Sequence, residues 1–181
     1  MISWVPDAEL PGYQQFSISL PGARTYPGEP EHEAVATLVR RTRPDSSRAV
    51  LYVHGWSDYF FQTHLAEAVE GWGYDFYALD LRRYGRSLRD GQLAGYTADL
   101  SEYYQELDAA IEVIRGEGHD HLVLFGHSTG GLVVSLFVRD RPGVADAVVL
   151  NSPWLELQSL QAWRPVLAAT FGAVGTLSPT R

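Results

Sequence analysis

One serine lies in a sequence context suited to nucleophilic catalysis. The short apolar run 122–125 is followed by Gly126-His127-Ser128-Thr129-Gly130, and a second apolar run begins at Leu132. Gly-x-Ser-x-Gly between a buried strand and a helix is typical of a nucleophile elbow, a sharp turn that exposes the serine Oγ. The alternative is a plain strand-turn-helix junction in which the serine only caps the helix. We predict that Ser128 is the nucleophile of an acyl-transfer reaction.

A nucleophilic serine needs a base, and the sequence supplies none in the usual place. Enzymes with this elbow order their triad as Ser, then Asp or Glu, then His, whereas all six histidines here precede Ser128. We expect the His54 ring to hold a loop through hydrogen bonds, and His127 to shape the pocket or the turn. His119 and His121 lie in a polar loop and are expected to be solvated. The 181-residue chain alone should therefore show little or no turnover.

A second motif can stabilise the negative charge that acyl transfer creates. The apolar run 49–53 is followed by His54-Gly55-Trp56-Ser57-Asp58. Preorganised backbone N–H groups stabilise a tetrahedral oxyanion, and in elbow enzymes one donor follows the nucleophile and the other follows this early strand. These donors would be the amides of Thr129 and Trp56, with Gly55 allowing the tight turn. The alternative is an ordinary strand-to-loop glycine turn.

The side chains around these two motifs are candidates for a substrate pocket. Tentative pocket residues are His54, Ser57, Asp58 and His127. Nearby aromatic residues suggest either an apolar pocket or plain core packing; they are Trp56, Tyr59, Phe60, Phe61 and Tyr84.

The loop 80–87 contains three arginines that could clamp an anion. We favour a structural role, in which Asp80 pairs with Arg82 to brace the loop and the other arginines are solvated. No glycine-rich loop has the spacing of a nucleotide cradle, and no histidine pair has metal-ligand spacing on one element. Cysteine is absent, which excludes disulfides and thiolate metal sites. We predict neither a metal nor a cofactor.

Periodicity predicts strands and helices in alternation. Strands are expected at 16–20, 34–41, 49–53, 74–79, 122–125 and 147–150, and helices at 63–71, 99–115 and 129–139. The helix at 99–115 begins with a candidate capping box, Asp99 and Glu102. Repeated strand-helix-strand units predict an α/β fold with a mostly parallel sheet and helices on both faces. Ligands bind outside the carboxyl ends of such strands, where Ser128 and the 54–58 motif lie.

Composition excludes several classes of partner. The chain has 181 residues, a net charge of −8 and a pI near 5.1, which disfavours nucleic acid and anionic membranes. No apolar run is long enough to span a membrane. The N-terminus lacks the basic and apolar regions of a signal peptide, so a cytoplasmic location is expected.

Taken together, four motifs resemble a known family. They are His54-Gly55-Trp56-Ser57-Asp58, the loop 80–87, Gly126 to Gly131, and Leu150-Asn151-Ser152-Pro153. Over roughly residues 35 to 155 the chain resembles the monoacylglycerol lipase, lysophospholipase and serine aminopeptidase-like branch of the α/β-hydrolases. The resemblance implies a carboxylic-ester substrate, in particular a lipid-derived acyl ester. It also implies Ser128 as nucleophile, an oxyanion hole from Trp56 and Thr129, and a cap domain after Pro153.

The chain departs from this family after the elbow. Asp140 and Asp146 come too early to be the triad acid, and no histidine follows. We therefore expect the N-terminal part of a longer hydrolase, truncated before the last strands, with 1–153 as part of the core and 154–181 as the start of the cap. The run 147–150 would then be an unpaired sheet edge, open to self-association.

Other functions stay open. A non-catalytic binding module could reuse the same fold, and a serine peptidase or thioesterase would use the same nucleophile. Dehalogenase chemistry is disfavoured, because it would need a carboxylate where Ser128 stands.

Overall fold

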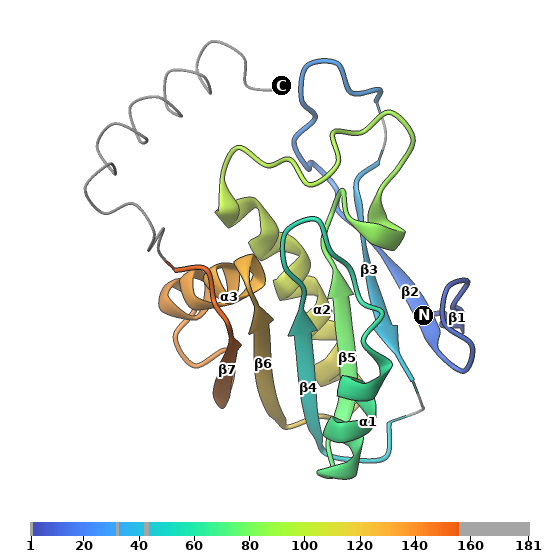
Figure 1. Ribbon diagram of the computed structural model, residues 1–181, viewed down its shortest axis with the longest axis vertical. Helices are drawn as coiled ribbons and strands as arrows, with labels where there is room; N and C mark the ends of the chain where they lie inside the picture. Colours follow the sequence, from blue (N-terminus) through green and yellow to red (C-terminus); the bar gives the residue numbers. More distant parts are fainter. Residues whose placement is uncertain (1, 32, 42–43, 156–181) are drawn as a thin grey trace.

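The central sheet is mixed, and its parallel half positions the candidate site. A computed structural model describes residues 2–31, 33–41 and 44–155, which include seven strands in the order β1-β2-β3-β5-β4-β6-β7 (Figure 1). β4 pairs in parallel with β5 and β6, and β6 with β7, while β1, β2 and β3 add to β5 in antiparallel fashion. The strands are β1 Val5–Pro6, β2 Gln14–Ser19, β3 Val35–Arg40, β4 Arg48–Val53, β5 Asp75–Asp80, β6 His121–His127 and β7 Ala147–Asn151.

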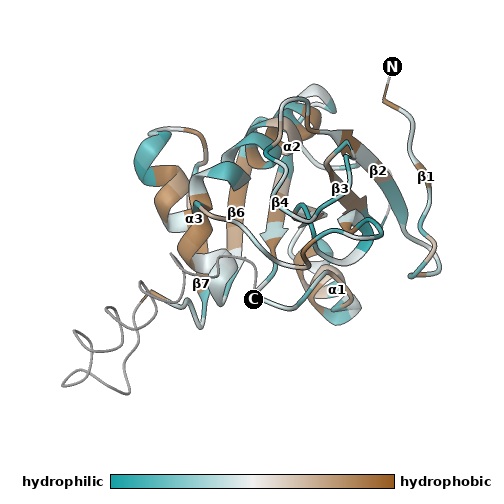
Figure 2. Cartoon of the chain, turned by 90° about the horizontal axis from the view of Figure 1, so that it is seen from above, coloured by the Kyte–Doolittle hydropathy of each residue, from teal (hydrophilic) through white to brown (hydrophobic). Residues whose placement is uncertain are grey.

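Helices cover both faces of this sheet, as expected. α1 (Thr63–Gly71) lies on one face, and α2 (Tyr104–Gly116) and α3 (Thr129–Asp140) lie on the other (Figure 2). Side chains of a strand alternate between faces. In β4, Leu51 therefore joins the core under α2 and α3, whereas Tyr52 joins the core under α1. Two short 3₁₀ helices, η1 (Gly85–Ser87) and η2 (Leu100–Tyr103), lie in the connection from β5 to α2.

The strand register brings the motif loops to one edge. Val53, the last residue of β4, pairs with Leu79 of β5 and Gly126 of β6, and His127 pairs with Asn151 of β7. The loops that follow these four strands consequently leave the sheet side by side. This edge is the carboxyl end of the parallel half, where α/β proteins bind ligands.

Most predicted elements are found near their expected bounds. The exception is β1, a strand of two exposed residues that no periodicity could reveal. The capping box forms only in part. The Asp99 carboxylate accepts a hydrogen bond from the Ser101 amide (2.8 Å), but Glu102 does not reach back to Asp99. Its carboxylate instead accepts from the Tyr26 hydroxyl (2.7 Å), a partner distant in sequence.

The arginines of the loop after β5 are buried, which corrects the prediction that most of them are solvated. Arg82 pairs with Glu106 of α2, not with Asp80. Asp80 accepts instead from Arg86 (2.9 Å). Each guanidinium is matched by a carboxylate because an unpaired buried charge is costly. Arg82 therefore braces the loop as predicted, but the carboxylate that pairs with it is not the predicted one.

The two histidines at the start of β6, His119 just before it and His121 as its first residue, differ in burial. His119 is buried, and its two ring nitrogens lie 2.8 Å from the Ile114 carbonyl and 2.8 Å from the Asp75 carboxylate. The expectation that His119 is solvated was wrong, because the end of α2 and the start of β5 close over the ring. His121 remains partly exposed.

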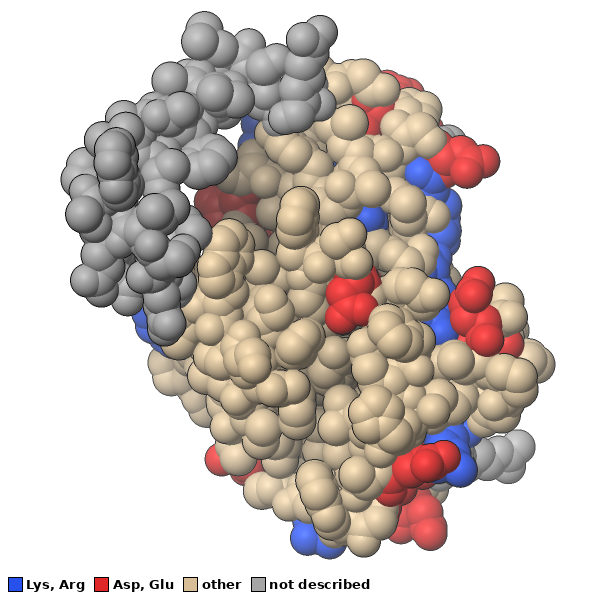
Figure 3. Space-filling view, viewed as in Figure 1, with Lys and Arg blue, Asp and Glu red and all other residues tan. Residues whose placement is uncertain are grey.

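β7 lies at an edge of the sheet and is exposed along its length. Val148, Val149 and Leu150 are 39–42% exposed, and β6 is the strand that pairs with β7 among the described residues. The surface over β6 and β7 is largely uncharged in the view of Figure 3. Self-association through this edge stays a prediction. The predicted cap start, 154–181, lies outside the described residues except for Trp154 and Leu155.

None of the helices in the described part of the chain is long and apolar enough to cross a membrane.

The ion pair between Arg82 and Glu106 yields a stability prediction. Both side chains are fully buried, so Glu106→Ala leaves a buried guanidinium without its carboxylate. We expect the free energy of unfolding to fall by about 3–5 kcal/mol. Glu112→Ala, on the exposed side of the same helix, should change it by less than about 0.5 kcal/mol. Urea unfolding followed by circular dichroism measures both, and equal effects of the two variants would contradict the assignment.

Candidate active site

Ser128 adopts the strained backbone of an elbow. Its φ is +52° and its ψ −119°, a combination that L-residues rarely adopt. The Ser128 amide donates to the Asn151 carbonyl (3.1 Å), and its carbonyl accepts from the amides of Gly131 (3.0 Å) and Trp154 (2.9 Å). Hydrogen bonds with α3, with the last residue of β7 and with the chain after it thus stabilise the strained turn.

The three glycines of the motif allow backbones to touch. A Cβ on Gly126 would lie 2.6 Å from the Gly131 Cα, and one on Gly131 would lie 2.7 Å from the Pro153 Cβ. A Cβ on Gly130 would collide with the carbonyl oxygens of Val53 and His54, at the end of β4. α3 therefore begins in direct backbone contact with the strand that carries the second motif.

Gly55 brings that second motif to the serine. A Cβ at Gly55 would lie 3.0 Å from the Ser128 Cβ and 3.5 Å from its Oγ. The amides of Trp56 and Thr129 donate no hydrogen bond to any group that the structure describes. Thr129 is the first residue of α3, where amides have no acceptor within the helix and the helix dipole is positive. Two backbone amides near Ser128 are thus without an acceptor among the described residues.

His54 holds its loop, as expected, and has no nitrogen free for catalysis. The Leu81 amide donates to His54 Nε2 (3.1 Å), so Nε2 carries no proton. Nδ1 lies 2.7 Å from the Gly55 carbonyl, to which it donates the ring proton. The ring also packs edge-on against Tyr84 at 4.8 Å. His54 therefore fastens the loop after β4 to the loop after β5.

The His127 ring lies beside the second motif but makes no hydrogen bond to it through Nδ1. Its Nδ1 is buried and has no hydrogen-bond partner among the described residues. Its Cδ2 would lie 3.4 Å from a Cβ at Gly55, so the ring lies against the second motif.

Strained residues gather at the carboxyl edge of the sheet. In the described part of the chain, four non-glycine residues have positive φ: Ser57 (55°), Arg83 (65°), Ser128 (52°) and Ser152 (47°). They follow β4, β5, β6 and β7 respectively. Such strain persists only where the surroundings impose it, and it clusters at functional sites. The clustering marks this edge independently of any sequence motif.

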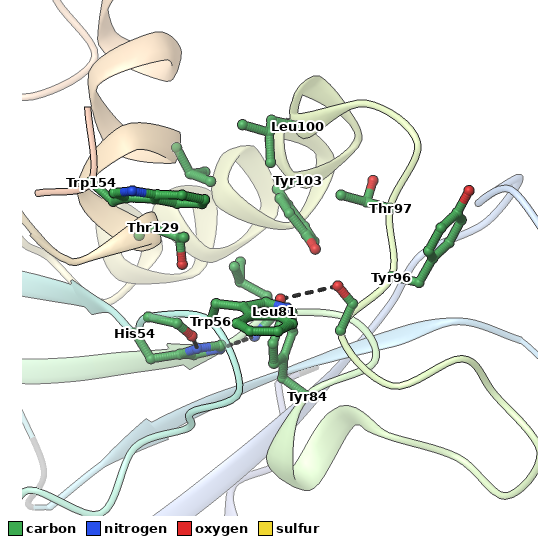
Figure 4. A pocket seen from close by; sticks show the side chains of 14 residues that line it. His54, Trp56, Leu81, Tyr84, Tyr96, Thr97, Leu100, Tyr103, Thr129 and Trp154 are labelled. Carbon is green, nitrogen blue, oxygen red and sulfur yellow. Dashed lines mark hydrogen bonds between the residues drawn. The ribbon is translucent and has the colours of Figure 1, made fainter. Parts of the chain in front are cut away.

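An apolar pocket of about 290 Å³ is lined by Gly55, Thr129 and Gly130, which adjoin Ser128, although Ser128 itself is not among the lining residues. Figure 4 shows the indoles of Trp56 and Trp154, with Thr129 between them, and Tyr96 and Thr97 on the side away from His54. The apolar pocket is lined by His54, Gly55, Trp56, Leu81, Tyr84, Gly95, Tyr96, Thr97, Leu100, Tyr103, Thr129, Gly130, Val133 and Trp154. Burial raises the pKa values of Tyr84 and Tyr103, so both hydroxyls stay protonated near neutral pH.

The tentative pocket residues are divided between two hollows. Of these four, His54 lines the apolar pocket, together with the predicted donor residues Trp56 and Thr129. Ser57 and Asp58 line a neighbouring side pocket of about 280 Å³, which also includes Tyr59 and Arg83. His127 lines neither hollow.

The aromatic residues near the second motif have different roles. Tyr84 lines the pocket, Phe60 is buried in the core beside α1, and Phe61 is 53% exposed. Much of the pocket wall comes from the segment 95–103, which the sequence analysis did not assign to the site. Leu100 and Tyr103 belonged to an apolar helical stripe, the same signal that core residues give.

No group of three metal-ligating side chains occurs among the residues that the structure describes.

The strained serine elbow, the adjacent backbone donors and the mixed sheet define the α/β-hydrolase class. The sequence matches the family model described as "Serine aminopeptidase, S33" over residues 44–181, so the chain belongs to this family of α/β-hydrolases.

Its relatives include lipases, and they also include epoxide hydrolases. The chain is 30% identical to a monoacylglycerol lipase of Mycolicibacterium smegmatis over 138 residues, covering 75% of this chain and 47% of that protein. It is 34% identical to lysophospholipase L2 of Escherichia coli over 90 residues, 45% of this chain and 25% of that one. The structure of a Paleococcus ferrophilus monoacylglycerol lipase matches with a TM-score of 0.55 at 26% identity, covering 72% and 47% of the two chains. The chain thus spans about half the length of these relatives or less.

Gly130 gives the sharpest test of the elbow packing. A methyl group there collides with two carbonyl oxygens, so we expect Gly130→Ala to destabilise the fold by several kcal/mol, about as much as overpacking a core. Gly116, the last residue of α2, has open space around its Cα. Gly116→Ala should therefore be neutral or stabilising by up to about 1 kcal/mol. Thermal unfolding of the two variants compares them, and a Gly130→Ala protein as stable as wild type would disprove the contact.

Proposed function

We propose that the chain carries the nucleophile and oxyanion hole of a carboxylic-ester hydrolase that acts on lipid-derived acyl esters. The observation that carries this proposal is the strained Ser128, with Gly55 packed against its Cβ. Beside it lie the amides of Trp56 and Thr129, which have no acceptor among the described residues. A serine that only capped a helix would need neither the strain nor the second loop.

The reaction would follow acyl-transfer chemistry. Ser128 Oγ attacks the ester carbonyl carbon while a base takes its proton, and the carbonyl oxygen becomes an oxyanion that accepts hydrogen bonds from Trp56 and Thr129. Collapse of this intermediate expels the alcohol, which takes up the proton, and leaves an acyl group on Ser128. Water then attacks the acyl-enzyme with help from the same base and releases the acid.

The base is the part that the described residues do not provide. Both nitrogens of His54 are engaged, and His127 Nδ1 is buried. No histidine follows Ser128 in this sequence. We propose that a histidine and an acid outside this sequence complete the triad, so that the 181-residue chain alone hydrolyses esters slowly or not at all.

The apolar pocket supports an acyl ester over a peptide as substrate. Its wall is formed mainly by aliphatic and aromatic side chains, such as Leu81, Leu100, Val133 and Trp154. A hydrocarbon chain gains from leaving water there. A peptide would bring amide groups that need hydrogen-bond partners, and this lining offers few.

Acylation of the serine tests the nucleophile without requiring a complete triad. Incubated with p-nitrophenyl butyrate, an activated ester, the chain should slowly gain one butyryl group on the peptide that contains Ser128, as detected by mass spectrometry. The adduct should persist, because deacylation needs the missing base. Added imidazole should speed both steps by acting as that base.

Two variants interpret this result. Ser128→Ala should abolish the adduct and the effect of imidazole beyond the background rate, whereas Ser101→Ala, at an exposed serine, should leave both unchanged. Absence of any adduct on wild type would favour a binding module that reuses the fold. Rapid turnover by the unaided chain, lost in Ser128→Ala, would show that a base is present after all.

A further inference from the structure

The far wall of the apolar pocket is a segment whose conformation depends on hydrogen bonds to other parts of the chain. Residues 93–98 contain neither helix nor strand, yet Gly95, Tyr96 and Thr97 line the pocket. The backbone amides of this wall find most of their acceptors elsewhere. The Leu93 amide donates to Glu29 (2.9 Å), the Gly95 amide to the Arg83 carbonyl (2.9 Å), and the Ala98 amide to the Tyr26 hydroxyl (2.8 Å).

Two of these three acceptors belong to residues 21–31, the part of the β2–β3 connection that we call the bracing loop. Glu29 is its centre. The Glu29 carboxylate accepts two hydrogen bonds from Arg83 (both 2.7 Å), one from the Tyr26 amide (3.0 Å) and one from the Leu93 amide. These bonds hold the pKa of Glu29 near 2, so the carboxylate stays charged at any ordinary pH. The side chains of both Glu29 and Arg83 are only 1% exposed.

Tyr26 supplies the second tether. Its hydroxyl donates to Glu102 (2.7 Å), just before α2, and accepts from the Ala98 amide. Its ring packs edge-on against Tyr96 at 4.7 Å, and the Arg83 guanidinium lies 4.8 Å from its centre. The bracing loop therefore contacts both ends of the wall and one of the aromatic rings within it.

Arg83 connects this network to the sheet. Arg83 lies three residues after the end of β5 and has a positive φ. Its guanidinium donates to Glu29, and its carbonyl accepts from the Gly95 amide. A buried, doubly hydrogen-bonded guanidinium and carboxylate form a rigid joint. The position of the wall is thus fixed by the sheet through Arg83 and by the bracing loop through Glu29 and Tyr26.

We propose that Glu29 and Tyr26 are positioning residues that set the length of acyl chain the apolar pocket accepts. This inference rests on the proposed function, because it assigns the acyl group to that pocket. About 290 Å³ is slightly smaller than most ligand sites, so a wall held in place favours a short or medium chain. Without the hydrogen bonds to Glu29 and Tyr26, the wall can move to admit a longer acyl chain, and it then contacts a short chain less closely.

The test is a binding titration of the 181-residue chain with octanoate and tetradecanoate. Intrinsic fluorescence reports occupancy, because Trp56 and Trp154 line the pocket. Tyr26→Phe removes the hydroxyl but keeps the ring. Of the two hydrogen bonds lost, the one from the Ala98 amide belongs to the wall. We therefore expect octanoate binding to weaken by about threefold to tenfold, the size of one hydrogen bond, and tetradecanoate binding to weaken less or to strengthen. Glu29→Gln should shift the same ratio of affinities further.

A matched control separates positioning from general damage. Tyr13 is a buried tyrosine on the opposite face of the sheet whose hydroxyl has no partner among the described residues, and Tyr13→Phe should leave both affinities unchanged. Hydrogen exchange of the amides in 93–98 should accelerate in Tyr26→Phe and not in Tyr13→Phe. Tyr26→Phe retains the buried ion pair, so it remains informative if Glu29→Gln fails to fold.

The outcomes distinguish this inference from the proposed function. If wild type binds neither acid, the acyl pocket itself is wrong and this inference falls with it. If wild type binds and folded Tyr26→Phe keeps the wild-type ratio of affinities, only the positioning role is overturned. A changed ratio without faster exchange in 93–98 would also overturn it, because the effect would then not pass through the wall.

Discussion

The backbone contact between the start of α3 and the end of β4 is the constraint on which the site depends. Gly130 lies so close to the carbonyl groups of Val53 and His54 that no side chain fits between them. This contact fixes the serine turn relative to the loop that carries Trp56. Two segments more than seventy residues apart in sequence thereby become one rigid unit. The proposed acyl transfer needs this rigidity, because donors stabilise an oxyanion well only when they are already in place.

The sheet, its helices and the serine turn could be predicted from sequence because each leaves a local pattern. The apolar runs of β4 and β6 read as buried parallel strands, and the glycines around Ser128 marked a close approach. What failed were pairings between distant segments. Nothing near Arg82 in the sequence indicates that Glu106 will face it, and nothing near Glu102 indicates Tyr26. Such partners are chosen by tertiary packing, so local reasoning named the wrong ones.

The pocket wall was missed for a related reason. Leu100 and Tyr103 sit on an amphipathic stripe, and a stripe buried against a sheet cannot be told by sequence from one buried against a ligand. The segment 93–98 has no periodicity at all, since its shape comes from groups that other loops present to it. The burial of the arginines was also missed, because arginines in a polar loop are usually solvated. Here Arg83 and Arg86 are buried and form ion pairs with Glu29 and Asp80.

The strand order has a consequence for how the chain is assembled. β3 pairs with β5, not with β4, which follows it in sequence; Thr37 lies opposite Asp80. During synthesis, the β2–β3 hairpin leaves the ribosome well before the strand it will join, while β4 leaves in between and takes a place further inside the sheet. A two-stranded hairpin is only marginally stable in water, and the edge of β3 stays unpaired until β5 has been synthesised. The N-terminal third of the chain can therefore fold only once β5 and the loop that follows it have been made. Non-local pairing of this kind slows folding.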